Sequence, residues 1–316
     1  MRIACVGKGG SGKTTTAAMF SRYVADQGHR VVAIDADINQ HLAQALGHDE
    51  PPPRALGADL GWLKEHVRGD NPRIATVASV IKTTPPGRGS RLLDLDPDDA
   101  VLRRFAARAG DVHLIAAGEF DESDVGVSCY HGKTGAVELY LNHLLDGPGE
   151  YVVVDMTAGA DAFASGLFTR FDLTVLVCEP TRRGVGVYRQ YADLAAGHGV
   201  ALRVLGNKVS EPADIDYLRD HVGDALLGWL VQSSWVRAAE RGAPAPIGSL
   251  EPANQAVLGT VQAELDSRTR DWVYYHRGTV EFHLRNAAAW ANRAVGADLA
   301  LQVDPDFVPG PVALLP

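Results

Sequence analysis

Short apolar runs recur along the chain, and segments with helix-like patterns separate them. The runs that we expect to form strands are Arg2–Val6, Arg30–Ile34, Val112–Ala116, Tyr151–Val154, Leu173–Cys178, Ala201–Gly206 and Leu226–Leu230. Runs such as VVAI, YVVV and TVLVC show no alternation with polar residues, which is typical of strands covered on both faces. The pattern therefore predicts an α/β fold, with a doubly wound, mostly parallel sheet and helices on both faces.

The predicted helices lie between these strands, and two regions do not follow this alternation of strand and helix. The helices are expected at Lys13–Gln27 and near Leu139–Leu145, Val185–Ala196, Asp214–His221 and Gln255–Leu265. Residues 48–100 are rich in proline, glycine and charge, so we expect an insertion of loops with one or two short helices. After about residue 267, Trp272–Val295 is helix-like and a proline-containing stretch follows it. We therefore predict a domain over residues 1–266 and a C-terminal helical extension over 267–316.

A glycine-rich motif joins the first predicted strand to the first predicted helix. It reads Gly7-Lys8-Gly9-Gly10-Ser11-Gly12-Lys13-Thr14, followed by Thr15. Glycines allow the backbone to curl so that successive N–H groups point at phosphate oxygens, and the helix N-terminus adds its positive end. In this motif the lysine bridges the β- and γ-phosphates and the following hydroxyl binds Mg²⁺. We therefore expect Lys13 and Thr14 to hold a nucleoside triphosphate with its magnesium ion.

Acidic residues follow two of the strands that should end at the same edge of the sheet. Asp35-Ala36-Asp37 closes the second strand, and Asp155 follows the run Val152–Val154. In a doubly wound sheet the carboxyl ends of the strands face the ligand crevice. Carboxylates there can hold Mg²⁺ or orient an attacking water. We expect Asp155 to bind Mg²⁺ directly or through water, and Asp35 to be structural or to support the metal shell.

The pattern K-G-G-x-G-K-T-T resembles the deviant Walker A motif of the ATPase family that includes MinD, ParA, nitrogenase iron protein and nickel-insertion ATPases. The resemblance spans roughly residues 1–266. It implies a catalytic role for Lys8, which would reach across a homodimer in the ATP state and stabilise transition-state charge at the partner's nucleotide. It also implies that Asp37 belongs to the switch that supports hydrolysis and touches the Mg²⁺ shell.

The same resemblance indicates which residues contact the base of the nucleotide. Gly206-Asn207-Lys208-Val209 follows a predicted strand and resembles the Asn-Lys that contacts the base in this family. A guanine site of the N-K-x-D type needs aspartate at position 210, where this chain has Ser210. We therefore expect Asn207 to bind adenine, and ATP to be preferred to GTP.

A possible transition-metal site lies between the third predicted strand and Asp155. YVVVDMTAG, Cys178-Glu179-Pro180 and GNKV resemble carbon-monoxide-dehydrogenase nickel-insertion ATPases, which carry C-x-C where this chain has Cys129-Tyr130-His131. Two such pairs in a dimer would make a Cys₂His₂ site for Zn²⁺ or Ni²⁺. A partly buried cysteine beside a polar loop histidine is the alternative. The cysteine that nitrogenase iron protein needs after its Walker B strand is absent from Asp155–Phe163, which argues against a bridging iron–sulfur cluster.

The amino-acid composition bears on the partners and the location that we expect for the protein. Lys and Arg total 30 and Asp and Glu total 39, so the formal net charge is −9, which argues against nucleic acid as a partner. Three cysteines do not suggest a disulfide framework, and no apolar run reaches membrane-spanning length. We expect a cytoplasmic ATPase that delivers a metal to a client protein. The alternative is a positioning or regulatory ATPase of the MinD or ParA kind, without a transition metal.

Overall fold

The computed structural model describes residues 1–48, 50, 54–119, 131–163 and 165–310, without the side chains of residues 131, 160 and 161. In this part of the chain eight strands form one sheet in the order β3-β4-β2-β5-β1-β6-β7-β8. Their bounds are β1 Arg2–Gly7, β2 Arg30–Ala36, β3 Ala107–Ala109, β4 Val112–Ala116, β5 Glu150–Met156, β6 Leu173–Cys178, β7 Leu202–Val209 and β8 Leu226–Val231. All pair in parallel except β3, a short antiparallel edge strand that the sequence pattern did not predict. The doubly wound α/β prediction is confirmed.

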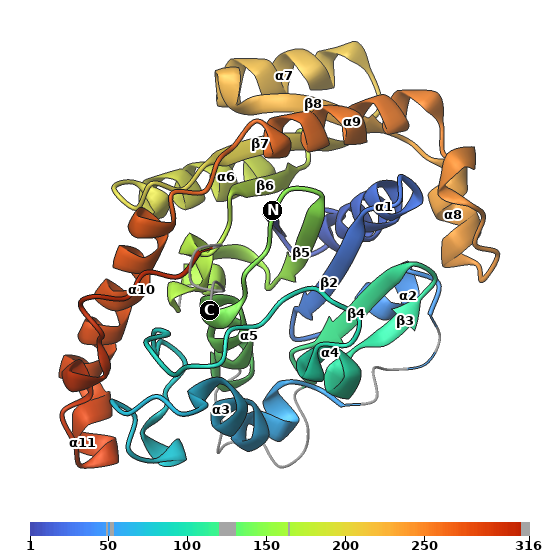
Figure 1. Ribbon diagram of the computed structural model, residues 1–316. Coiled ribbons are helices and arrows are strands. Elements are labelled where there is room, and N and C mark those ends of the chain that lie inside the picture. Colours follow the sequence, from blue (N-terminus) through green and yellow to red (C-terminus); the bar gives the residue numbers. More distant parts are fainter. Residues whose placement is uncertain (49, 51–53, 120–130, 164, 311–316) are drawn as a thin grey trace.

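Helices cover both faces of the sheet (Figure 1). The longer ones are α1 Lys13–Asp26, α3 Leu60–Arg68, α5 His131–His143, α6 Arg182–Ala195, α7 Pro212–Val222, α9 Pro252–Asp266 and α10 Trp272–Asn286. Shorter ones are α2 Leu42–Ala45, α4 Ala100–Phe105, α8 Ser234–Glu240 and α11 Asn292–Val295, and single turns of 3-10 helix connect several of them. A π-helical turn, Ala287–Ala291, joins α10 to α11. The helix predicted over Trp272–Val295 is therefore unbroken, but its central turn has the hydrogen-bond pattern of a π-helix.

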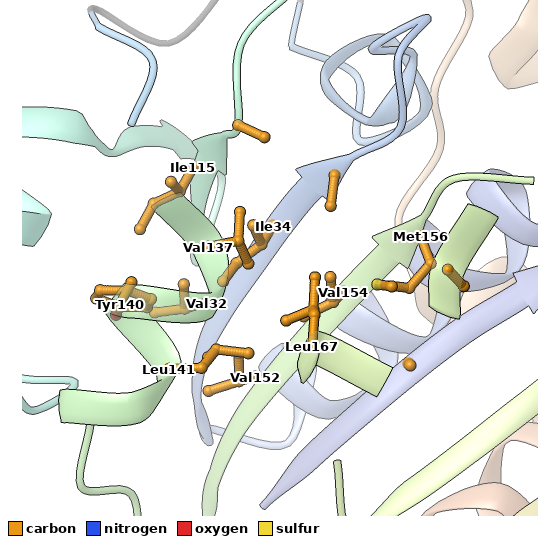
Figure 2. Close-up of a cluster of buried hydrophobic side chains, with 14 of the residues drawn as sticks. Val32, Ile34, Ile115, Val137, Tyr140, Leu141, Val152, Val154, Met156 and Leu167 are labelled. Atoms are coloured by element: carbon orange, nitrogen blue, oxygen red, sulfur yellow. The ribbon is translucent and has the colours of Figure 1, made fainter. Parts of the chain in front are cut away.

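Alternate residues of each central strand belong to two separate cores. On β1, Ala4 and Val6 face one core and Ile3 and Cys5 face the other. The first core contains side chains of α3, α4, α5, α6 and α7, and the second contains side chains of α1, α2, α8 and α9. Figure 2 shows side chains of β2 and β5 meeting those of α5 in the first core. Burial on both faces explains why the strand sequences are continuously apolar.

The insertion and the C-terminal extension pack against each other. Gln302 donates a hydrogen bond from Nε2 to the carbonyl of Ser79 at 2.9 Å, and Arg88 Nε lies 2.9 Å from Asp304 Oδ2. A small apolar cluster joins Ile81 to Ala287, Ala291 and Leu299. Among the described residues from 48 to 99, α3 is the one helix longer than a single turn, and α4 begins at Ala100, which agrees with the predicted content of loops and short helices. Where the ATPase domain ends remains a prediction.

Candidate functional site

The glycine-rich loop lies between β1 and α1, at the carboxyl edge of the sheet. Gly10 and Gly12 have φ of 78° and 97°, a backbone conformation that glycine adopts without a steric penalty. A Cβ at Gly12 would overlap the side chain of Asn207, whose Nδ2 donates to the carbonyl of Ser11 at 2.7 Å. A Cβ at Gly7 would come within 2.7 Å of the Val177 carbonyl. The glycines are therefore required by close packing as well as by backbone conformation.

Lys13 meets carboxylates from two other strand ends. Its ammonium pairs with Asp37, which follows β2, and Asp155 at the end of β5 acts on the same charge. Burial disfavours the ammonium, but the two carboxylates outweigh it and raise the pKa of Lys13. Although the lysine is only 6 % exposed, these carboxylates keep it a cation inside the site. This charge is the counter-charge that a β,γ-phosphate group needs.

Asp155 and Thr14 form the second half of the site. Thr14 Oγ1 donates to Asp155 Oδ2 at 2.5 Å, while Asp155 Oδ1 is buried without a hydrogen-bond partner. Burial raises the pKa of Asp155 to about 7, and Lys13 opposes the shift. An unpartnered buried carboxylate oxygen beside a threonine hydroxyl is the hard-oxygen donor set that Mg²⁺ prefers. The residues present therefore fit a magnesium ion held by Thr14 and Asp155.

Asp35 has a different role from Asp37. Its two oxygens accept the backbone N–H of Asp37 at 3.2 Å and that of Leu42 at 2.8 Å. Burial raises the pKa of Asp35 to about 6, and both backbone hydrogen bonds oppose this. These bonds hold the turn after β2, so Asp35 shapes the loop that positions Asp37. The structural role expected for Asp35 agrees with this geometry.

A cavity of about 1040 Å³ runs from the glycine-rich loop towards α8. Its lining includes Gly9, Lys13, Thr14, Thr15, Asp37, Asn207, Ser210 and Trp235. The volume lies at the upper end of small-molecule sites, which is appropriate for a nucleotide. Asn207 and Ser210 both line this cavity. The Ser210 hydroxyl donates to Asp214 at 2.9 Å and helps to begin α7. Contact between Asn207 and adenine stays a prediction.

The sequence from residue 3 to residue 245 matches the family described as the CobQ/CobB/MinD/ParA nucleotide binding domain. The chain belongs to this family. It is 32% identical over 243 residues to the carbon monoxide dehydrogenase accessory protein CooC of Rhodospirillum rubrum, covering 76% of this chain and 87% of that protein. It is 28% identical over 235 residues to an uncharacterized ATP-binding protein of Methanocaldococcus jannaschii, covering 73% of this chain and 84% of the relative.

Solved structures of the same family share the fold. A ParA family ATPase from Chlorobium tepidum TLS has a TM-score of 0.58 at 14% identity, with 84% of this chain and 98% of the other covered. The cell division ATPase MinD of Pyrococcus furiosus has a TM-score of 0.53 at 17% identity, with 83% and 98% covered. Membership of this nucleotide-binding family explains the lysine, threonine and aspartates that meet at the loop. In the described residues we find no helix long and apolar enough to cross a membrane.

The family's early lysine, Lys8, lies outside the cluster around Lys13. Its Nζ is 2.9 Å from Glu179 Oε2, and Lys208 Nζ is 2.6 Å from Glu179 Oε1. Hydrogen bonds from Lys208 and Lys8 lower the pKa of Glu179. Sequence reasoning noted Glu179 only as part of a resemblance and gave it no role. Its position directly after β6, at the edge where the other site residues gather, was the available signal.

The predicted transition-metal pair falls at the margin of the described structure. Cys129 lies outside the described residues, and His131 is the first residue of α5 with an undescribed side chain. Across the described ranges, no group of three or more histidine, cysteine, aspartate or glutamate residues is arranged to hold a metal ion. The other two cysteines, Cys5 and Cys178, are buried in the cores. A Zn²⁺ or Ni²⁺ site at Cys129 and His131 therefore stays a prediction.

Proposed function

We propose that this protein is an ATP-hydrolysing dimeric switch that delivers a metal ion to a client enzyme. The observation that carries the proposal is the meeting of Lys13, Thr14, Asp37 and Asp155 at one phosphate-binding loop. The metal-delivery part rests on the similarity to the accessory protein CooC. ATP is the nucleotide because no carboxylate stands at position 210 to pair with guanine.

The residues of the loop divide the chemistry between them. The backbone N–H groups of Gly9–Gly12 and the ammonium of Lys13 bind the phosphates and neutralise their charge. Bound Mg²⁺ would supply Lewis-acid stabilisation of the developing negative charge. Thr14 and Asp155 hold that ion, and Asp37 orients the attacking water while contributing to the metal shell. Asp37 also pairs with the Lys13 ammonium, so this carboxylate and the phosphates compete for the same charge.

Lys8 completes the active site of a second copy of the chain. Lys8 pairs with Glu179 at the rim of its own site. Its side chain is already partly exposed, so extending it towards a partner chain changes its burial little. Reaching a partner's nucleotide would place a cation at the phosphoryl group in the transition state, as an arginine finger does. Hydrolysis then requires two chains, which makes ATP binding a switch for assembly.

The cargo site is formed at the dimer axis. One chain offers Cys129 and His131, which is too few ligands for a tightly bound ion. Two chains offer four, a number that suits tetrahedral Zn²⁺ and is acceptable for Ni²⁺. Dimer closure with ATP then raises metal affinity because closure assembles the ligands.

Metal analysis of the purified dimer tests the cargo site. We expect about one Zn²⁺ or Ni²⁺ per two chains after loading, and loss of most of it in Cys129→Ser with ATP binding retained. Ser128→Ala, next to the cysteine, is the matched control and should keep its metal. Equal metal in Cys129→Ser and the parent would remove the cargo role and favour a positioning or regulatory ATPase.

The concentration dependence of hydrolysis tests the switch separately. We expect the rate per chain to rise with protein concentration, and Lys8→Ala to lose this rise while still binding ATP. A constant rate per chain from a strict monomer would exclude the action of Lys8 in trans, whatever the metal analysis shows.

A further inference from the structure

A second cavity lies at the opposite edge of the sheet from the nucleotide. It has a volume of about 280 Å³ and is formed between residues 169–172, the loop 197–201 and residues 268–282. Phe171 and Asp172 precede β6, and Ala201 precedes β7, so the cavity is at the amino ends of strands whose carboxyl ends face the glycine-rich loop. Its third wall is formed by residues of α10 and of the turn before it, beyond the part of the chain that matches the family.

The floor of this cavity contains a buried arginine without a carboxylate partner. Arg170 is 2 % exposed, and no ion pair is formed by it within the described structure. Its guanidinium donates to hydroxyl, amide and carbonyl oxygens of Thr169, Asn142, Tyr275 and Thr279. Burial lowers the pKa of Arg170, because desolvation exceeds the help of the nearby Tyr275 and Glu138. The hydrogen-bond partners of Arg170 are neutral, and Glu138 offsets the guanidinium charge only in part, so this buried positive charge is incompletely compensated.

The rest of the lining holds three more arginines, of which, among the described residues, two are paired with carboxylates and one, Arg277, is not. Arg170, Arg268, Arg270 and Arg277 line the cavity together with Asp172, Asp271 and Glu281. Arg270 is paired with Asp172, and Glu281 with Arg285. Arg268 pairs with Glu264 through Nη2, although its Nε is buried without an acceptor. Arg277 is exposed and forms no ion pair in the described residues. Asp271 is the remaining carboxylate, and it accepts the N–H of Tyr274 at the start of α10.

We propose that this cavity binds a small oxyanion, a carboxylate or a phosphate, between Arg170 and Arg277. Arginine forks suit both groups because they present parallel N–H donors. Phe171, Tyr274 and Phe282 also line the cavity, which favours a carboxylate with a small apolar body. The volume is too small for a second nucleotide. A bound anion contacts the body and α10 together, so it stabilises the docking of the extension.

Calorimetric titration of the full-length protein with benzoate and with inorganic phosphate tests the site. Saturating ADP and Mg²⁺ are included because the glycine-rich loop itself attracts phosphate. We expect saturable binding, tighter for benzoate than for phosphate if the aromatic wall contributes. Arg277→Ala should weaken it about tenfold or more, the usual effect of losing a charged hydrogen bond.

The control is Arg293→Ala, which removes an exposed arginine without an ion pair from α11, outside the cavity. It should bind the anion like the parent, and both variants should bind ADP normally because both positions lie away from the loop. Absence of saturable binding by either anion, or equal affinity in Arg277→Ala and the parent, would overturn the proposal. None of these outcomes bears on hydrolysis or dimer formation.

Discussion

Lys8 Nζ lies 2.9 Å from Glu179 Oε2, so the lysine proposed to act on a partner's nucleotide is held by a carboxylate of its own chain. Glu179 also accepts from Lys208, whose Nζ donates to the carbonyl of Gly10 at 2.7 Å. The end of β6 is thereby joined to the phosphate loop and to β7. In the dimer that we propose, Lys8 has to leave Glu179 to reach the partner's nucleotide.

Glu179→Gln should therefore promote ATP-dependent dimerisation. A partly exposed ion pair contributes up to about 1 kcal/mol, and a symmetric dimer has to break two of them, so removing both should lower the dimer dissociation constant by up to about thirtyfold. Analytical ultracentrifugation over a range of protein concentrations, with ATP and Mg²⁺, measures this. Asp224→Asn, which removes an exposed negative charge from the turn before β8, should leave the constant unchanged. Weaker dimerisation of Glu179→Gln would show that the pair does not restrain Lys8.

Asp37 and Asp35 provide a matched pair of variants. Asp37→Ala should bind ATP and lose hydrolysis by about a hundredfold or more, the usual range for removing a group that orients or deprotonates water. Asp35→Ala should instead destabilise the protein by about 1–3 kcal/mol for each backbone N–H left unsatisfied. Steady-state hydrolysis and urea unfolding, measured on both variants, separate the two roles. A parent-like rate for Asp37→Ala would remove it from the mechanism.

The pKa of Asp155 predicts how magnesium binding depends on pH. Burial raises this pKa to about 7, so the carboxyl group is largely protonated below that pH and must release its proton to bind Mg²⁺. Affinity for Mg²⁺ with ADP should therefore fall as the pH is lowered from 8 to 6, towards about tenfold per unit below pH 7. Asp155→Asn should bind Mg²⁺ weakly at every pH and without this slope. Titration with Mg²⁺ at fixed ADP checks the result, and a flat profile in the parent would contradict it.

The same shift affects the stability of the nucleotide-free protein. Because the folded-state pKa of Asp155 is above its unfolded value, its contribution to stability is full at low pH and is lost as the pH rises through about 7. Asp35 acts in the same direction around pH 6. The loss should be smaller in Asp155→Asn, which urea unfolding at pH 6 and pH 8 would show.

The sequence was most informative where one local pattern determines one element. Continuous apolar runs located the parallel strands because burial on both faces leaves no polar alternation. The strand β3, Ala107–Ala109, is only three residues long and has no such pattern. The start of α5 was placed eight residues too late, at Leu139, because Gly132-Lys133-Thr134-Gly135 has poor helix propensity. Lys82 of the insertion packs within 3.1 Å of a Cβ built at Gly135, a tertiary contact that no local pattern contains.

The functional site likewise contains residues that local patterns predicted and residues that they did not. The motif located Lys13 and Thr14, and the strand ends located Asp37 and Asp155, because parallel strands bring their carboxyl ends to one edge. The partner of Lys8 was missed because 171 residues separate it from Glu179. Arg170 was missed for a related reason, since its neighbours come from α5 and α10.

The C-terminal extension supplies a charge that the body of the protein needs. Asp146 is fully enclosed, and Arg270 binds it with Nη1 at 2.7 Å and Nη2 at 2.8 Å. Arg2 Nε and the Met1 ammonium lie 2.7 and 2.6 Å from the same carboxylate. Burial opposes the charge, but Arg2, Arg270 and the amino terminus outweigh it and hold the pKa of Asp146 well below its ordinary value. The extension therefore completes a buried charge network that begins at the first residue.

Arg270→Ala should destabilise the folded protein by about 3–5 kcal/mol, because breaking a buried ion pair leaves a charge that is incompletely compensated. Arg285→Ala is the control: this arginine pairs with Glu281 on the surface of α10, and its loss should cost no more than about 0.5 kcal/mol. Urea unfolding of the two variants at pH 7 gives the comparison. Equal stability of the two would show that the body does not need the charge of Arg270. A large loss confined to Arg270→Ala would mean that a chain ending at residue 266 cannot retain the parent's stability, since Asp146 would lose its bidentate partner.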